Sequence, residues 1–191
     1  MKKLTLQVAV ALLTLATQAS FAKDSFTLSS SDIKAGSRID MKHVFKGFGC
    51  EGGNLSPALA WSGAPAGTKS YALMVHDANA PTGGAGWWHW VAYNIPADAK
   101  GLDQGAGTAD GAKLPNGAVQ ANTDFGAPGW GGPCPPQGHG VHNYVFTLYA
   151  IKTDKLEIPA GATASLAGYM INGNSLASAK LRGVYSRPKA K

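Results

Sequence analysis

One carboxylate and two histidines are the side chains of this sequence with the most potential for chemistry. Asp77 follows the strand-like run 71–76, His89 opens a second such run, and His142 precedes a third at 144–151. If these runs are neighbouring antiparallel strands, all three side chains lie at one end of a sheet, because loop ends then lie side by side. A carboxylate beside two imidazoles favours their protonated form. With tyrosine and backbone donors, the group can hold a phosphate or another small oxyanion.

The loops that would carry these residues are rich in glycine and proline. Gly83, Gly84 and Gly86 lie between Asp77 and His89 and allow backbone N–H groups to approach a ligand. Pro135 and Pro136 stiffen the loop that leads to His142 in the same way. These loops favour a preformed polar pocket.

The sequence of these segments resembles that of the phosphatidylethanolamine-binding protein family, in its bacterial Raf kinase inhibitor-like branch. The motifs are D-x-x-A-P at 77–81, W-W-H-W at 87–90 and G-P-C-P-P at 132–136, followed by H-x-Y at 142–144. The resemblance extends from about residue 26 to about residue 185. Carried over position by position, it implies a pocket for a phosphate-type ligand with Trp88 at its mouth, and the lining residues Asp77, Pro81, His89, Pro135, Pro136, His142 and Tyr144.

Two motifs depart from the pattern of the family. Ala78 and Asn79 replace the Pro and the second Asp of the usual D-P-D-A-P, and Asn143 replaces the Arg of H-R-Y. The missing Arg would have been a strong partner for an anion. His139, in the adjacent loop, is interpreted as a surface residue, with partial compensation for that Arg as the alternative.

The N-terminus has the features of a secretory signal peptide. Lys2 and Lys3 precede an uncharged apolar run at 4–16, and Ser20 and Ala22 supply small residues at the positions that a signal peptidase reads. The apolar run is short for a membrane span. We therefore expect cleavage after Ala22, an exported single domain at 23–191 that is not an integral membrane protein, and a periplasmic location, with secretion into the medium as the alternative.

The charge of the chain excludes a simple nucleic-acid binder. Removing Lys2 and Lys3 lowers the formal net charge from +6 to +4, and no basic stripe interleaved with aromatic residues is present. This small excess of positive charge supports only a mild preference for anionic ligands.

Cys50 and Cys134 are the two cysteines of the chain. Export to an oxidising compartment favours a disulfide between them, and two buried free thiols are the alternative. Neither has a nearby His or a C-x-x-C partner, which argues against a catalytic thiol or a zinc site.

Strand-like runs separated by segments rich in Gly, Pro, Asn and Asp predict a mainly β domain, either a sandwich or a barrel. The runs lie at 26–28, 58–61, 71–76, 89–95, 144–151 and 181–185. A short helix is expected at 165–170, with Thr163 as its N-cap. The family resemblance implies two antiparallel sheets in Greek-key order, with one or two short helices near the C-terminus.

These features predict a binding protein that is not an enzyme and uses no cofactor or metal. Its partners would be a small phosphate-type anion and possibly another protein. One alternative is an interaction or protease-inhibitor protein with a vestigial pocket. A metal-assisted hydrolase is less favoured, because neither a G-x-S-x-G nor an H-E-x-x-H motif is present.

Overall fold

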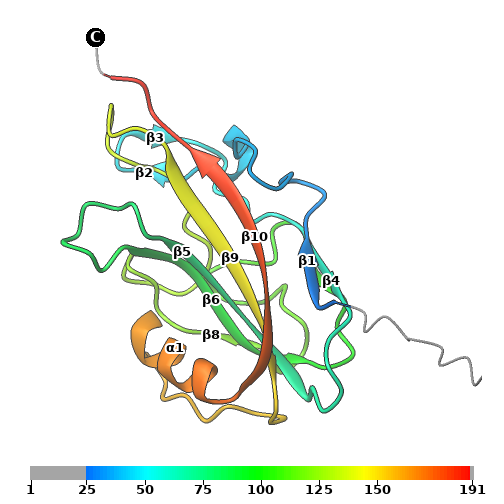
Figure 1. Ribbon diagram of the computed structural model, residues 1–191. Helices are drawn as coiled ribbons and strands as arrows, with labels where there is room; N and C mark the ends of the chain where they lie inside the picture. Colours follow the sequence, from blue (N-terminus) through cyan, green and yellow to red (C-terminus); the bar gives the residue numbers. More distant parts are fainter. Residues whose placement is uncertain (1–24, 190–191) are drawn as a thin grey trace, which may run out of the picture.

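The computed structural model describes residues 25–189, so the predicted signal peptide at 1–22 lies outside the described residues. Antiparallel strands dominate the fold (Figure 1). The strands are β1 (Thr27–Ser29), β2 (Lys46–Gly47), β3 (Cys50–Glu51), β4 (Leu59–Ser62), β5 (Ser70–Asp77), β6 (Trp87–Pro96), β7 (Gly101–Leu102), β8 (Val119–Gln120), β9 (His142–Ile151) and β10 (Ser175–Tyr185). The helices are the 3-10 turn η1 (Met41–His43) and α1 (Ala164–Gly173).

The strands form a large sheet, a small sheet and a hairpin. The large sheet has the order β10-β9-β5-β6-β8, the small sheet the order β1-β4-β7, and β2 pairs with β3. A core that includes Leu28, Trp61, Leu73 and Phe146 lies between the two sheets. The prediction of a β-sandwich with two antiparallel sheets is therefore confirmed.

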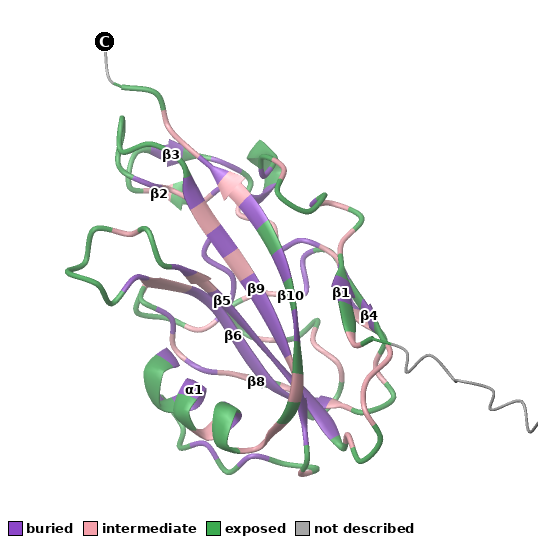
Figure 2. Cartoon of the chain, in the orientation of Figure 1, coloured by how far each residue is buried: buried purple, intermediate pink, exposed green. Residues whose placement is uncertain are grey.

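Strand β5 lies in the middle of the large sheet and is buried on both faces (Figure 2). Leu73 and Val75 belong to the core between the sheets, whereas Ala72 and Met74 belong to a second core under α1. Because side chains of a strand alternate between its faces, this continuous apolar run is what a strand covered on both sides requires.

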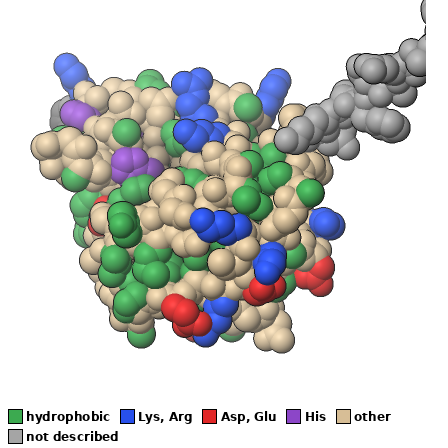
Figure 3. All heavy atoms as spheres, turned by 60° about the horizontal axis from the view of Figure 1, so that its bottom comes forward, with side chains coloured by type: hydrophobic (Ala, Val, Ile, Leu, Met, Phe, Trp, Pro, Cys, Tyr) green, Lys and Arg blue, Asp and Glu red, His purple; other side chains and the backbone are tan. Residues whose placement is uncertain are grey.

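Helix α1 covers the outer face of the large sheet. Its predicted N-cap is confirmed, since the Thr163 hydroxyl accepts a hydrogen bond of 3.2 Å from the N–H of Leu166. Ala167 and Ile171 face the sheet, while Tyr169 points outward and is 81% exposed. Figure 3, which brings the bottom of Figure 1 forward, shows hydrophobic side chains gathered toward the side on which α1 lies.

The edge strand β10 is longer than the sequence predicted. The expected run 181–185 is only its second half, and pairing with β9 begins at Ser175. In the first half, exposed side chains, Lys180 among them, alternate with small side chains that are half-buried or, at Ala179, buried. A run of such composition has little apolar signal, because an edge strand with one solvated face needs few large hydrophobic residues.

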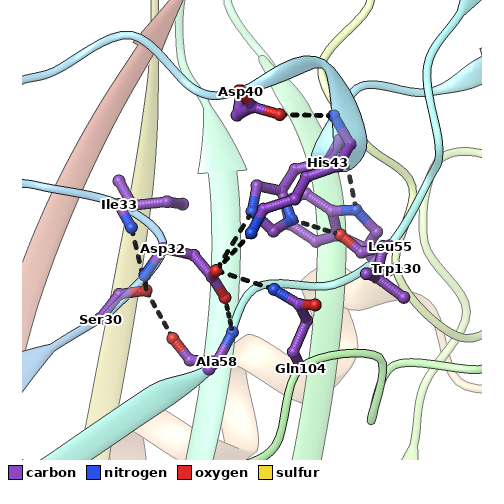
Figure 4. A network of polar contacts seen from close by, with 10 residues as sticks. Ser30, Asp32, Ile33, Asp40, His43, Leu55, Ala58, Gln104 and Trp130 are labelled. Atoms are coloured by element: carbon purple, nitrogen blue, oxygen red, sulfur yellow. Dashed lines mark hydrogen bonds and ion pairs between the residues drawn. The ribbon is translucent and has the colours of Figure 1, made fainter.

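A polar network centred on Asp32 joins the chain segments beside the small sheet (Figure 4). Its carboxylate accepts hydrogen bonds from Lys42 Nζ at 2.7 Å, the N–H of Ala58 at 2.8 Å and Gln104 Nε2 at 2.7 Å. Burial alone would raise the pKa of Asp32, but these hydrogen bonds outweigh it and lower the pKa to about 2. The network therefore holds its carboxylate ionised.

Cys50 and Cys134 form a disulfide with a Cα–Cα distance of 6.0 Å across 84 positions of sequence. It connects β3 to the loop before β9, as the sequence predicted. Among residues 25–189, no helix has the length and apolar character needed to cross a bilayer.

Replacing both cysteines by alanine should lower the free energy of unfolding by about 4 kcal/mol, because the cross-link restricts a long loop of the unfolded chain. Urea unfolding of the oxidised protein and the double variant measures the difference. Thiol titration of the wild type under denaturing, non-reducing conditions should find no free thiol. Two titratable thiols would contradict the disulfide itself.

Candidate ligand-binding site

Asp77, His89 and His142 converge at one end of the large sheet. Asp77 ends β5 and pairs with Trp87 of β6 on one side and with Tyr144 of β9 on the other. His142 Nδ1 donates to Asp77 Oδ2 at 2.6 Å, and both side chains are buried. The N–H of Asn79 donates to the other carboxylate oxygen at 2.9 Å. Two hydrogen bonds thus stabilise a carboxylate that would otherwise be costly to bury.

A shift in strand register brings His89 to this group. Val75 pairs with Trp90 but His76 pairs with Trp88, so His89 is an extra residue on β6. Such a bulge re-aims side chains locally. As a result, His89 lies beside Tyr144, with ring centroids 5.0 Å apart, while Trp90 fills the core between the sheets.

Trp88 does not lie at the mouth of the site, which corrects the prediction from the motif. Its ring lies beside that of His76, with centroids 4.1 Å apart and planes tilted by 37°, and it packs against the core under α1, on the opposite face of the sheet. Trp87 lies where Trp88 was expected, and its ring centroid is 5.5 Å from that of Phe125. Residues two apart in a strand point to the same face, so Trp87 is expected on the face of His89. The alternation of side chains alone therefore predicts Trp87, and not Trp88, in the site.

His89 is held as a neutral imidazole. Its Nδ1–H donates to the carbonyl of Gly131 at 2.6 Å, because a carbonyl can only accept, and Nε2 is left as an acceptor. Complete burial lowers the pKa of His89 to about 4, against the opposing effects of the Gly131 hydrogen bond and the charge of Asp77. At neutral pH this side chain therefore accepts a hydrogen bond and carries no charge.

Two donors in the site have no hydrogen-bond partner within 3.5 Å among residues 25–189: the buried hydroxyl of Tyr144 and the indole N–H of Trp87. Burial, the neighbouring charge of Asp77 and a longer contact of the hydroxyl with that carboxylate raise the pKa of Tyr144, so the hydroxyl stays protonated. Buried donors are nearly always paired in folded proteins. A ligand with acceptor atoms in this cavity would supply the hydrogen-bond partners that the two donors lack.

His139 extends the polar group toward solvent. Its Nδ1 lies 2.8 Å from Nε2 of His142, which itself holds Asp77. The side chain is exposed, as expected, but it is not an isolated surface residue. The predicted surface position of His139 is confirmed, and the contact with His142 connects it to the site.

Close backbone contacts position the loop before β9. A Cβ on Gly132 would clash with the carbonyl oxygen of His43, and one on Gly131 would clash with the Phe125 ring. The N–H of Gly132 donates to Asn54 Oδ1 at 2.8 Å. These contacts and the disulfide fix the wall of the site that Pro135 provides.

The site is a cavity of about 310 Å³ with a mainly apolar lining. Every residue predicted for it from the motifs except Trp88 lies in its wall. The structure adds an aromatic side to the cavity, made by Phe48, Trp87 and Phe125. Phe48 comes from the β2–β3 hairpin and is 70% exposed. No local pattern marks Phe48 or Phe125, because each reaches the cavity from a distant segment.

The two departures from the family pattern contact each other. Asn79 Oδ1 accepts hydrogen bonds of 2.9 Å from both the N–H and Nδ2 of Asn143, and Arg182 Nη1 donates to Asn143 Oδ1 at 3.2 Å. Asn143 lies on the strand between His142 and Tyr144 and therefore points to the other face. It holds the 78–86 loop instead of facing the cavity.

Within residues 25–189, no group of three or more His, Cys, Asp or Glu side chains is arranged to hold a metal ion. Tyr144 and Trp87 offer donors, while Asp77 and the Nε2 atom of His89 offer acceptors.

The low pKa of His89 predicts acid destabilisation. Between pH 6.5 and 4 the unfolded chain protonates this side chain while the folded chain does not, so stability falls as the pH decreases. We expect a loss of about 2 kcal/mol between pH 7 and pH 5 that the His89→Gln variant does not show. Urea unfolding at both pH values measures it. An imidazole that titrates near 6.5 in the folded protein by NMR would contradict this prediction.

Comparison with known proteins identifies similar sequences. Residues 29–186 match the family profile "Phosphatidylethanolamine-binding protein". The UPF0098 protein YbcL of Escherichia coli K12 is 48% identical over 185 residues, which are 97% of this chain and 98% of that protein. The UPF0098 protein YbhB of the same strain is 43% identical over 83% of this chain and 99% of its own length. A protein of Mycobacterium tuberculosis described as "Putative lipoprotein LppC" is 36% identical over 86% of this chain and 74% of its own length.

Solved structures show the same fold. The crystal structure of Escherichia coli YbcL, described as a member of the mammalian PEBP family, superposes with a TM-score of 0.82 at 51% identity. It covers 84% of this chain and 98% of YbcL. A homologue from Chlamydia trachomatis has a TM-score of 0.71 at 30% identity, over 85% of this chain and 98% of its own. With its sandwich fold and its motifs, the chain belongs to the phosphatidylethanolamine-binding protein family.

Proposed function

We propose that this protein is an exported, phosphatidylethanolamine-binding-like protein of the bacterial periplasm that binds a small phosphate-type ligand and does not turn it over. One observation carries the proposal: two unpaired donors, on Tyr144 and Trp87, lie in the wall of one cavity beside the acceptors Asp77 and His89. A singly protonated phosphate group has both kinds of atom. Its unprotonated oxygens can accept from the two donors, and its P–OH can donate to the acceptors.

The apolar part of the cavity supports an organic phosphate over the free ion. The aromatic side chains of Phe48, Trp87 and Phe125 surround space that a bare phosphate would not fill. An ester group placed there would bury apolar surface, which is favourable in proportion to its area. The name of the family describes binding of a phospholipid, which is also an organic phosphate, although its phosphodiester group has no P–OH to donate.

Export is supported by the disulfide and by the N-terminal sequence. Disulfides persist in oxidising compartments such as the periplasm and are rare in the cytosol. The relative LppC is described as a putative lipoprotein, which also suggests a location at the cell envelope. We propose the periplasm as the compartment.

Replacing Tyr144 by Phe should weaken binding of inorganic phosphate and phenyl phosphate by about tenfold or more, because a hydrogen bond to a charged group is lost. Calorimetric titration measures both affinities. The variant should keep its stability, since the hydroxyl has no partner among residues 25–189. Tyr149→Phe, on β9 away from the cavity, is the matched control. Equal affinity of Tyr144→Phe and wild type would contradict the site, and release of phosphate from phenyl phosphate would contradict a pure binding role.

The aromatic side of the cavity can be tested separately. Phe48→Ala should weaken binding of phenyl phosphate by several-fold and leave inorganic phosphate unchanged, because the side chain contacts only the organic part of the ligand. Since Phe48 is 70% exposed, its removal should cost little stability. A parallel loss of affinity for both ligands would assign Phe48 to the shape of the whole site instead of to the organic group.

A further inference from the structure

Two Asn-Gly pairs lie on the surface of the protein in different backbone conformations. One pair, 116–117, lies in a turn before β8, and the other, 172–173, ends α1. All four residues are exposed. The peptide nitrogen of a glycine can attack the side-chain amide of a preceding asparagine, because no Cβ obstructs the approach. The two pairs therefore share their chemistry and their exposure and differ in how the backbone is held.

Asn116 and Gly117 are the central residues of a turn. The N–H of Ala118 donates to the carbonyl of Pro115 at 3.0 Å and closes it. Gly117 has a φ of 88°, as the second central residue of a type II turn requires. A Cβ on Gly117 would meet no atom within 4 Å, and its N–H donates to no backbone carbonyl in the part of the chain that the structure describes. The peptide nitrogen of Gly117 therefore lies in open space and is held by no backbone hydrogen bond.

Asn172 and Gly173 are fixed in the last turn of α1. N–H groups beyond the first turn of a helix donate to the carbonyl four residues earlier, and the N–H of Gly173 is one of them. The side chain of Asn172 is also engaged, since its Nδ2 donates to the carbonyl of Gly168 at 2.7 Å. Both groups that would have to react in this pair are therefore hydrogen-bonded.

We propose that Asn116 is a site of spontaneous covalent modification, at which deamidation replaces the side-chain amide by a carboxylate. The nitrogen of Gly117 attacks Cγ of Asn116. The new N–Cγ bond closes a cyclic imide, the Cγ–Nδ2 bond breaks, and ammonia leaves with the peptide proton. Water then opens the imide at either carbonyl carbon, which gives aspartate or, where the backbone bond is the one cleaved, isoaspartate. Water is the co-reactant, no electrons are transferred, and the phosphate-type site is not involved.

The new carboxylate would lie beside the edge of the large sheet. Gln120 of β8 accepts a hydrogen bond of 2.7 Å from Trp90 Nε1 and donates one of 2.9 Å to the carbonyl of Thr108. These contacts hold β8 to the core independently of the turn. We therefore expect the modified protein to keep its fold, while the formal net charge of the chain 23–191 falls by one, from +4 to +3.

Incubation of the folded, oxidised protein at neutral and at mildly alkaline pH tests the proposal. Peptide mapping by tandem mass spectrometry assigns each new carboxyl group to its residue. We expect progressive conversion of Asn116 to aspartate and isoaspartate, faster at the higher pH because the attacking nitrogen must lose its proton. Asn172 should remain an amide over the same period. In urea, where α1 is lost, Asn172 should convert as well.

Two variants separate this reaction from other sources of acidic protein, which isoelectric focusing detects. Asn116→Gln keeps an amide at this position but needs a larger ring, so the acidic band of the incubated protein should be lost. Asn172→Gln should leave the conversion of Asn116 unchanged. The proposal is overturned if Asn116 stays an amide in the folded protein while it converts in urea. It is equally overturned if Asn172 converts in the folded protein as fast as Asn116 does, because the turn and the helix would then not determine the reactivity.

Discussion

The pairing of β5 with β6 on one edge and with β9 on the other is the constraint on which the structure depends. β5 is buried on both faces, so a shift of its register by one residue would exchange the two cores. This register also places Asp77 between Trp87 and Tyr144. The apolar packing along β5 fixes its register, and the register in turn brings the polar side chains together at the end of the sheet.

Burial gives the site its chemical character. Asp77 is stabilised by His142 and by the N–H of Asn79, whereas His89 avoids the cost of burial by remaining neutral. The donors of Tyr144 and Trp87 are left without partners in the part of the chain that the structure describes. A folded protein that leaves such groups unpaired forgoes stability, and binding sites are where such a loss is commonly found.

Much of the fold and of the site followed from local patterns. The convergence of Asp77, His89 and His142 came from an argument about loop ends, and the cap of α1 came from Thr163 alone. The error at Trp88 arose because a motif was transferred without counting alternation along β6.

Other features depended on contacts between distant segments, which no local pattern encodes. Phe48 and Phe125 reach the cavity from loops far apart in sequence. The contact of His139 with His142 depends on the path of a loop, and the first half of β10 lacked an apolar signal because it is an edge.

The hydrogen bonds between Asn79 and Asn143 determine how the contact that holds the 78–86 loop responds to salt and pH. Where Asp and Arg occupy these positions, as the family pattern has them, the same contact would join opposite charges, and dissolved salt would weaken it. Two amides carry no charge and do not titrate. The loop at the mouth of the cavity is thus held by a contact that is indifferent to ionic strength and acidity. This contact would therefore persist over a range of salt concentrations and pH values.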